Sequence, residues 1–182
     1  MRGRGAGEIG HLTLERFGPQ CGCGKQGCYE ALASGTVIRR SFQYALGRGR
    51  HSKLAGLPTE EVNAVLIAEA AREGDRLVLE VFEVSAFNTG IALSYLVGLL
   101  NPQRIIIGGG MSASLDLMWE KIQDTLILNT MDYPLRQVEA LTSGLGNRAG
   151  VLGAAMMSIR TMIGRVSNPP LGSRTFRGLD QG

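Results

Sequence analysis

The sequence predicts an α/β protein, and three of its features support that prediction. A run of branched aliphatic residues at 104–107 is typical of a short buried strand, and it leads directly into three consecutive glycines. An amphipathic helix is expected at 115–128, and a stretch at 75–100 that is apolar on most sides precedes the strand. Strands that alternate with helices favour an α/β architecture around one hydrophobic core.

The composition is that of a globular domain. The chain has 182 residues, of which 44% are hydrophobic and 19% charged, so it can bury a core and is too apolar for disorder. Three cysteines are too few, and odd in number, for a disulfide scaffold. The net charge of +3 does not by itself indicate a nucleic-acid partner. Residues 1–15 hold no apolar segment of the kind that a signal peptide needs.

The first third of the chain is expected to hold a strand, a loop and a helix. We predict a strand at 9–15, a glycine-rich loop at 17–28 and a helix at 29–46. No acidic residue occurs between Ala31 and Thr59, whereas several basic ones do. This run is either a solvated basic face, which we expect, or a nucleic-acid patch. Its cations are Arg39, Arg40, Arg48, Arg50 and Lys53.

Two further helices follow. A Pro-Thr-Glu-Glu segment predicts a helix at 59–73 with Thr59 as its N-cap, and the glycine after it stops the helix. The next helix, at 75–100, starts at an aspartate and ends before an Asn-Pro pair. Residues 84–103 carry no charge and are long enough to cross a membrane, but their Ser, Thr, Asn and Gly residues favour a buried helix of a soluble protein without a membrane partner.

The C-terminal part is predicted to contain one more strand and one more helix. The strand is expected at 138–141, and Asn147 is a suitable N-cap for a helix that ends near residue 163. Residues 165–182 contain two adjacent prolines, several glycines and few apolar residues, and we expect them to be a disordered tail.

One histidine and three cysteines form the most specific cluster in the sequence. His11, Cys21, Cys23 and Cys28 make a Cys3His set, which suits a tetrahedral Zn²⁺ ion with a structural role. The glycines between the cysteines let the backbone fold tightly around one ion. The spacing is C-x-C-x4-C and not the C-x2-C of zinc fingers, so free thiols, or one disulfide with a spare thiol, remain the alternative.

Several motifs resemble those of one protein family. GEIGH at 7–11 and CGCGKQGCYE at 21–30 resemble the zinc signature of the ROK family (repressors, open reading frames and kinases). The family pattern, ExGH followed by CxCGxxGCxE, is met at every fixed position. NPQRIIIGGGMS at 101–112 is similar to the strand and glycine turn near the family's nucleotide, and LGNRAGVLGAA at 145–155 resembles the start of its closing helix. The resemblance covers residues 3–164.

The resemblance implies both a fold and a sugar site. Residues 1–164 would be the C-terminal lobe of an actin-like (ribonuclease-H-like) ATPase fold, with a zinc loop at 11–28. Glu8 and Glu30 would accept hydrogen bonds from sugar hydroxyls, and His11 would both bind the zinc and face the sugar. A structural ion would then preorganise the sugar site. Without the family pattern, an ordinary loop surface would be the preferred interpretation of the two carboxylates, and the family pattern reverses that preference.

The glycine turn is the candidate nucleotide site. Backbone N–H groups at such a turn can approach a phosphate closely, although the same turn also serves as a plain strand-to-helix connection. Where the family commonly has acidic residues, this chain has Asn147 and Arg148. The resemblance implies ATP and Mg²⁺ as cofactors of the whole protein. The candidate nucleotide-binding residues are Gly108, Gly109, Gly110, Met111 and Ser112.

Kinases of this family carry three segments that this sequence does not contain. These are an Asp-x-Gly-x-Thr phosphate loop, a catalytic aspartate in an Asn-Asp segment and a glycine-rich phosphate segment before ExGH. We therefore expect this chain to be the C-terminal part of a ROK protein. It holds no catalytic residue, and we expect it to be inactive as a kinase by itself.

Two functions of the whole protein are compatible with these motifs. The first is a glucokinase-type hexose kinase that transfers the γ-phosphoryl group of ATP. The alternative is the sugar-sensing domain of a ROK-type repressor, and nucleic-acid binding is expected only if a DNA-binding domain precedes this sequence. The resemblance implies a homo-oligomer, and three clustered thiols indicate a reducing, cytoplasmic environment.

Overall fold

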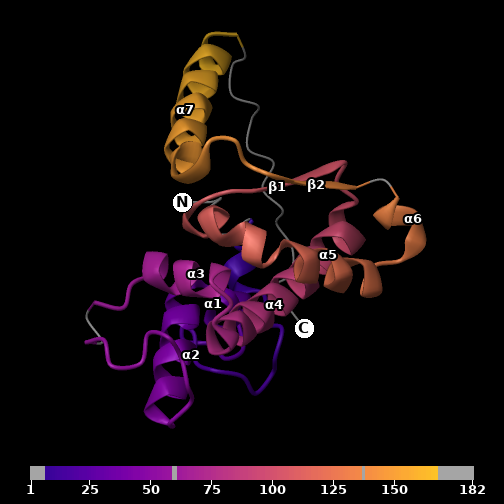
Figure 1. Cartoon of the computed structure of the whole chain (residues 1–182). Coiled ribbons are helices and arrows are strands. Elements are labelled where there is room, and N and C mark those ends of the chain that lie inside the picture. Colours follow the sequence, from indigo (N-terminus) through magenta and orange to yellow (C-terminus); the bar gives the residue numbers. More distant parts are fainter. Residues whose placement is uncertain (1–6, 59–60, 137, 168–182) are drawn as a thin grey trace, which may run out of the picture.

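One long helix, α4 (Arg76–Leu100), organises the fold (Figure 1). The structure is a computed structural model, and it describes residues 7–58, 61–136 and 138–167. Asp75 caps the helix by accepting a hydrogen bond from the Val78 backbone N–H, and Asn101 ends it in the left-handed conformation, with φ of 43°. The helix predicted over this range is confirmed, but its burial is partial, since Val84, Leu99 and Leu100 are exposed.

Within the described residues, five other helices pack against α4, and side chains from most of them form the core with it. Within the described chain α4 is the one helix with the length and hydropathy to cross a membrane. The largest fully buried side chains of the core come from α4 and from α2 (Gly35–Gly47), α3 (Ala64–Arg72) and α5 (Trp119–Leu128). Among them are Phe42, Ile67, Leu77, Val78, Val97 and Ile122.

The helix predicted at 29–46 is two helices. α1 (Tyr29–Ala33) and α2 (Gly35–Gly47) are separated by Ser34, whose backbone is extended. The Ser34 hydroxyl accepts a hydrogen bond from the Val37 backbone N–H, so this serine caps a new helix instead of continuing the first. On either side of this break, α1 and α2 both pack against α4.

The helix predicted at 59–73 starts later than expected. α3 (Ala64–Arg72) is capped by Asn63, whose side-chain oxygen accepts from the Val65 and Leu66 N–H groups. An asparagine that satisfies two free N–H groups at once makes the more effective cap. Thr59, the predicted cap, lies outside the described residues.

The sheet contains two parallel strands, β1 (Arg104–Ile107) and β2 (Glu139–Thr142), in which Ile105 pairs with Ala140. The strand at 104–107 is confirmed, and the one predicted at 138–141 is shifted by one residue. Between the strands lie a 3₁₀ helix, η2 (Gly110–Leu117), and two α-helices, α5 (Trp119–Leu128) and α6 (Asp132–Leu135). The helix predicted at 115–128 is thus divided between η2 and α5.

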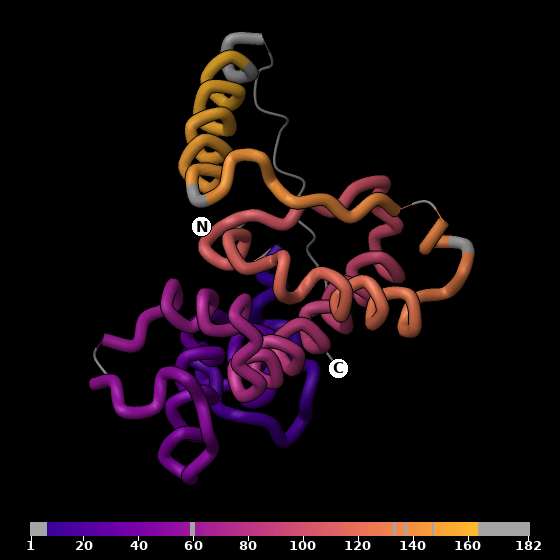
Figure 2. The backbone as a smooth tube through the Cα atoms, viewed as in Figure 1, coloured from indigo at the N-terminus to yellow at the C-terminus, as the bar shows by residue number. Residues whose placement is uncertain are grey.

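The last helix stands apart from the rest of the described chain. A short 3₁₀ helix, η3 (Gly146–Arg148), leads into α7 (Ala149–Ser167), which projects beyond the sheet (Figures 1 and 2). The helix runs four residues further than predicted, and residues 168–182 of the expected tail lie outside the described residues. Large apolar side chains of this helix are exposed, namely those of Val151, Leu152, Met156, Met157, Ile159, Met162 and Ile163.

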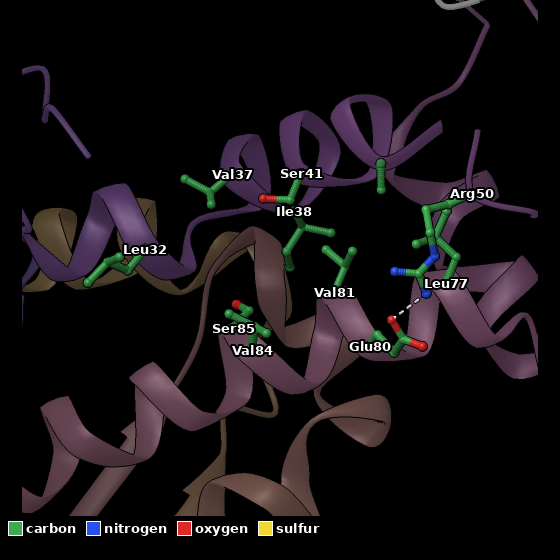
Figure 3. A pocket seen from close by; sticks show the side chains of 11 residues that line it. Leu32, Val37, Ile38, Ser41, Arg50, Leu77, Glu80, Val81, Val84 and Ser85 are labelled. Carbon is green, nitrogen blue, oxygen red and sulfur yellow. Dashed lines mark hydrogen bonds and ion pairs between the residues drawn. The ribbon is translucent and has the colours of Figure 1, made fainter. Parts of the chain in front are cut away.

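A small cavity of about 210 Å³ lies between α2 and α4 (Figure 3). Val37 and Ile38 face Val81 across it, and an ion pair of 2.8 Å between Arg50 and Glu80 stands at one end. None of the candidate site residues lines this cavity, so the candidate site must be sought elsewhere.

Candidate functional site

The loop that carries the cysteines is folded back on the segment before it. The strand predicted at 9–15 is wrong: residues 9–11 form a 3₁₀ helix, η1 (Ile9–His11), and Thr13 forms an isolated bridge with Cys28. The Leu14 N–H donates to the Gly27 carbonyl, and the Tyr29 N–H donates to the Leu12 carbonyl. These backbone groups form hydrogen bonds with the cysteine-bearing loop and not with another strand, so the segment is not part of a sheet.

The four predicted metal ligands meet at one point. The ligand atoms of His11, Cys21, Cys23 and Cys28 all lie within 4.8 Å of one another. The Cys23 and Cys28 sulfurs are 3.7 Å apart, and the Cys21 sulfur is 3.6 Å from His11 Nδ1. A tetrahedral zinc ion with bonds of about 2.3 Å to sulfur and about 2.0 Å to nitrogen gives sulfur–sulfur edges of about 3.8 Å and sulfur–nitrogen edges of about 3.5 Å. The cluster therefore fits zinc in both its donor set and its size.

The backbone of the loop holds this geometry. The Cys21 N–H donates to the Lys25 carbonyl at 2.8 Å, and the Gly24 N–H donates to the Cys21 carbonyl at 3.0 Å. Gly27 has a φ of 66°, and a Cβ there would collide with the Glu15 carbonyl. The position admits only glycine, since both its dihedral angle and the close approach of Glu15 exclude a side chain.

The thiols have the electrostatics of a site that needs a cation. Burial, and to a lesser extent the neighbouring sulfurs of Cys23 and Cys21, raise the pKa of the Cys28 thiol to about 11. The pKa of Cys23 is lowered, chiefly by a hydrogen bond from the Lys25 backbone. Three thiolates in contact would repel one another, so a bound divalent cation is what makes the deprotonated cluster stable.

Of the three predicted sugar-binding residues, two lie together at the cluster. The His11 Nδ1 atom is 3.7 Å from Glu30 Oε2, and both side chains are partly exposed. Cys28 is the N-cap of α1, and Glu30 lies in the first turn of that helix. Glu8 precedes η1, and its backbone carbonyl accepts from the His11 N–H at 3.0 Å while its side chain is exposed. No contact joins the Glu8 side chain to Glu30 in the described part of the chain.

The predicted nucleotide-binding turn lies at the end of β1. Gly109 has a φ of 94°, and the Ser112 hydroxyl donates to its carbonyl at 2.6 Å. Gly108 packs closely on Ser143, near the start of α7. If Gly35, the first residue of α2, carried a Cβ, that atom would lie 3.1 Å from the Met111 sulfur. The turn is therefore in close contact with α2, which follows the Glu30-bearing helix α1 in the chain.

Sequence reasoning missed the residues that fix α1 in place. The Tyr29 hydroxyl lies 3.1 Å from Thr89 Oγ1, and the Ser85 hydroxyl donates to the Ala33 carbonyl at 2.8 Å. These contacts attach both ends of α1 to α4. The signal was available, because Ser85 and Thr89 are polar residues within an apolar helix and such residues are hydrogen-bonded when buried.

Comparison with known proteins gives a consistent result. The profile described as the ROK family matches residues 1–161. A glucokinase of Thermotoga maritima is 36% identical over 160 residues, which are 86% of this chain and 50% of that protein. The DNA-binding transcriptional repressor Mlc of Escherichia coli is 29% identical over 150 residues, which are 82% of this chain and 36% of that protein. The chain spans half or less of the length of these relatives.

Solved structures agree in fold. A ROK family glucokinase from Streptomyces griseus, in complex with glucose and AMPPNP, superposes with a TM-score of 0.71 at 30% identity, over 84% of this chain and 51% of that one. A ROK hexokinase from Thermus thermophilus superposes with a TM-score of 0.67 at 29% identity, over 88% of this chain and 52% of that one. From its signature, its fold and these matches, the chain belongs to the ROK family.

Proposed function

We propose that this chain is the C-terminal, actin-like lobe of a glucokinase-type hexose kinase, and that it supplies the zinc centre, the sugar-binding carboxylates and part of the nucleotide site. The observation that carries the proposal is the position of Glu30, whose carboxylate oxygen lies 3.7 Å from the His11 ring beside the Cys3His cluster. It is supported by the match to glucokinases over half of their length.

The zinc ion would act as a structural centre and take no part in the transfer. Bound by His11 Nδ1 and three thiolates, it fixes the imidazole and the loop that leads into α1. Glu30 is then held at the surface of that centre, where its carboxylate can accept hydrogen bonds from two adjacent sugar hydroxyls. Glu8 would complete the sugar site from the other side of η1.

The glycine turn would approach the nucleotide from the sheet. Gly109 has the positive φ that exposes neighbouring N–H groups, and the turn stands next to the first residue of α2. Phosphoryl transfer also requires Mg²⁺, a phosphate loop and a base for the attacking hydroxyl, and the 182 residues of the chain contain no match to those family segments. This chain would therefore bind a hexose without phosphorylating it.

A second function is favoured by a specific observation. Transcriptional repressors of the ROK family also match this chain, at 28–29% identity, and a ROK regulator superposes with a TM-score of 0.69. Because the repressors share the zinc signature, the site itself fits both functions. In either case we expect the whole protein to be an oligomer. We also expect it to reside in the reducing cytoplasm, because its three neighbouring cysteines are free.

The decisive experiment uses the coding sequence upstream of Met1. The chain joined to that sequence is purified and tested for ATP-dependent phosphorylation of glucose, and for binding to its own promoter region. The kinase proposal predicts hexose phosphate and no promoter complex. A promoter complex that glucose releases, without any phosphorylation, would establish the repressor instead.

A further inference from the structure

The four residues of the Cys3His cluster differ in solvent exposure: Cys23 is exposed, and the other three are more buried. Cys23 is exposed, whereas Cys21 and Cys28 are only 5% and 0% exposed. Solvent therefore reaches the cluster from the side of Cys23. A small oxidant that enters from solvent meets this residue first, and thiolates bound to a metal remain nucleophilic.

A suitable partner for Cys23 is already in place. Its sulfur lies 3.7 Å from that of Cys28, and a disulfide needs this separation to fall to about 2.05 Å. Cys21 is the less suitable partner, because a bond to it would close a ring around the single residue Gly22. The Cys21 sulfur instead lies beside His11 Nδ1.

We propose that Cys23 and Cys28 form an oxidation site, at which a peroxide converts two zinc ligands into a disulfide and releases the ion. This inference rests on the zinc assignment and goes beyond the kinase proposal. The Cys23 sulfur attacks one peroxide oxygen, the O–O bond breaks, and Cys23 becomes a sulfenic acid while hydroxide leaves. The Cys28 sulfur then attacks the Cys23 sulfur, the S–S bond forms, and the S–O bond breaks to release hydroxide.

The balance of this reaction is complete with hydrogen peroxide as the oxidant. The two sulfurs lose two electrons, the peroxide gains them, and the two hydroxides leave as water once they are protonated. His11 and Cys21 are the two ligands that remain, which is too few for a closed structural site. Zinc release is therefore the expected consequence of the new bond, and a dithiol reductant with added zinc would restore the centre.

The positions of the basic residues make the linkage easy to detect. Trypsin cleaves after Arg16, Lys25 and Arg39, so Cys21 and Cys23 fall in peptide 17–25 and Cys28 falls in peptide 26–39. A Cys23–Cys28 bond joins the two peptides, whereas a Cys21–Cys23 bond leaves them separate. Alkylation before digestion marks the cysteine that stayed free, and fragmentation of the joined peptides then distinguishes Cys21 from Cys23.

The experiment treats the purified, zinc-containing chain with hydrogen peroxide in the presence of a zinc-indicator dye. We expect one zinc released per disulfide formed, the two peptides joined through Cys23 and Cys28, and an alkylated Cys21. Dithiothreitol followed by zinc should reverse both changes. A Cys28→Ala variant, which keeps Cys21 and Cys23, should give no joined peptides.

Three results would overturn the oxidation site: zinc that stays bound after the peptides are joined, a bond that involves Cys21, or oxidation of Cys23 to a sulfinic acid without any link. These results come from the wild-type chain alone, so they stand even if the variant fails to fold. Metal content is measured before the peroxide is added. A chain purified without chelator that holds no zinc would contradict the zinc assignment, and with it the release, whereas a zinc-loaded chain that forms no link contradicts the oxidation site only.

Discussion

The Tyr29 hydroxyl donates a hydrogen bond to Thr89 Oγ1, at 3.1 Å, and so connects the metal loop to the central helix. The direction follows from the second bond of Thr89, whose own hydrogen is donated to the Ser85 carbonyl at 2.8 Å. Tyr29 lies between Cys28, a candidate metal ligand, and Glu30, a candidate sugar ligand. The position of the candidate sugar site thus depends on a contact with a helix 60 residues away in the chain.

Replacing Tyr29 by phenylalanine should weaken the fold at this point. The Tyr29→Phe variant removes one hydrogen bond and leaves Thr89 without its donor, so we expect the free energy of unfolding to fall by about 1 kcal/mol. Urea unfolding followed by circular dichroism measures it. Tyr44→Phe is the matched control, because the Tyr44 side chain is exposed and its hydroxyl accepts from the exposed Arg48 side chain. Equal stability of the two variants would mean that the Tyr29 hydroxyl contributes nothing.

A methyl group on Gly27 should disrupt the metal loop. Gly27→Ala places a Cβ against the Glu15 carbonyl and also adds the penalty of a positive φ, about 1–2 kcal/mol. We expect zinc affinity to fall at least tenfold, as measured by competition with a chelating dye. Gly24→Ala shares the positive φ but meets open space, and Gly22→Ala has neither problem. We predict that zinc affinity decreases in the order Gly22→Ala, Gly24→Ala, Gly27→Ala. A Gly27→Ala variant with the zinc affinity of the wild type would contradict the geometry.

Removing the charge of Glu30 should affect sugar and not metal. A hydrogen bond from a hydroxyl to a carboxylate contributes about 1.5–3 kcal/mol, so Glu30→Gln should weaken glucose binding by about ten- to a hundredfold. Titration calorimetry measures the affinity, and elemental analysis should find the zinc content unchanged. Glu61→Gln, at an exposed carboxylate remote from the cluster in sequence, should bind as the wild type does. Similar affinities for the two variants would remove Glu30 from the sugar site.

The metal-free chain should lose stability in alkaline solution. Burial raises the pKa of Cys28 from 9.0 to about 11, so the folded state holds the thiol proton more tightly than the unfolded state. This contribution is complete below pH 9 and is lost as the pH rises to about 11. Thermal melting of the EDTA-treated chain across this range should show a falling midpoint. The zinc-bound chain keeps Cys28 as a thiolate, so the same fall should be absent from it, and a parallel fall in both would contradict this assignment.

The predictable parts of the fold have strong local signals. The central helix is predicted correctly because Asp75 and the Asn101–Pro102 pair are unambiguous start and stop signals. The candidate metal ligands could be identified because a histidine and three cysteines lie within one short segment, and the structure brings them together. The contacts that position them, such as that of Tyr29 with Thr89, join distant segments and leave no periodic pattern in the sequence.

The wrong predictions share one cause. The strand expected at 9–15 does not form, because the Leu14 and Glu15 N–H groups donate to the Gly27 carbonyl of the returning loop. The residue pattern alone does not distinguish Ser34 and Asn63 from their neighbours, although each is the cap at which a helix begins. In each case a competing local hydrogen bond outweighs the residue pattern.

Glucose binding with and without zinc tests the central claim most directly. Titration calorimetry compares the purified chain, the same chain after EDTA treatment, and the stripped chain after zinc is restored. If the His11–Cys21–Cys23–Cys28 centre shapes the pocket in which Glu30 meets the sugar, glucose binds the first and third samples and its affinity falls at least tenfold in the second. Equal affinity in all three samples, or no binding to the zinc-loaded chain, would contradict the account.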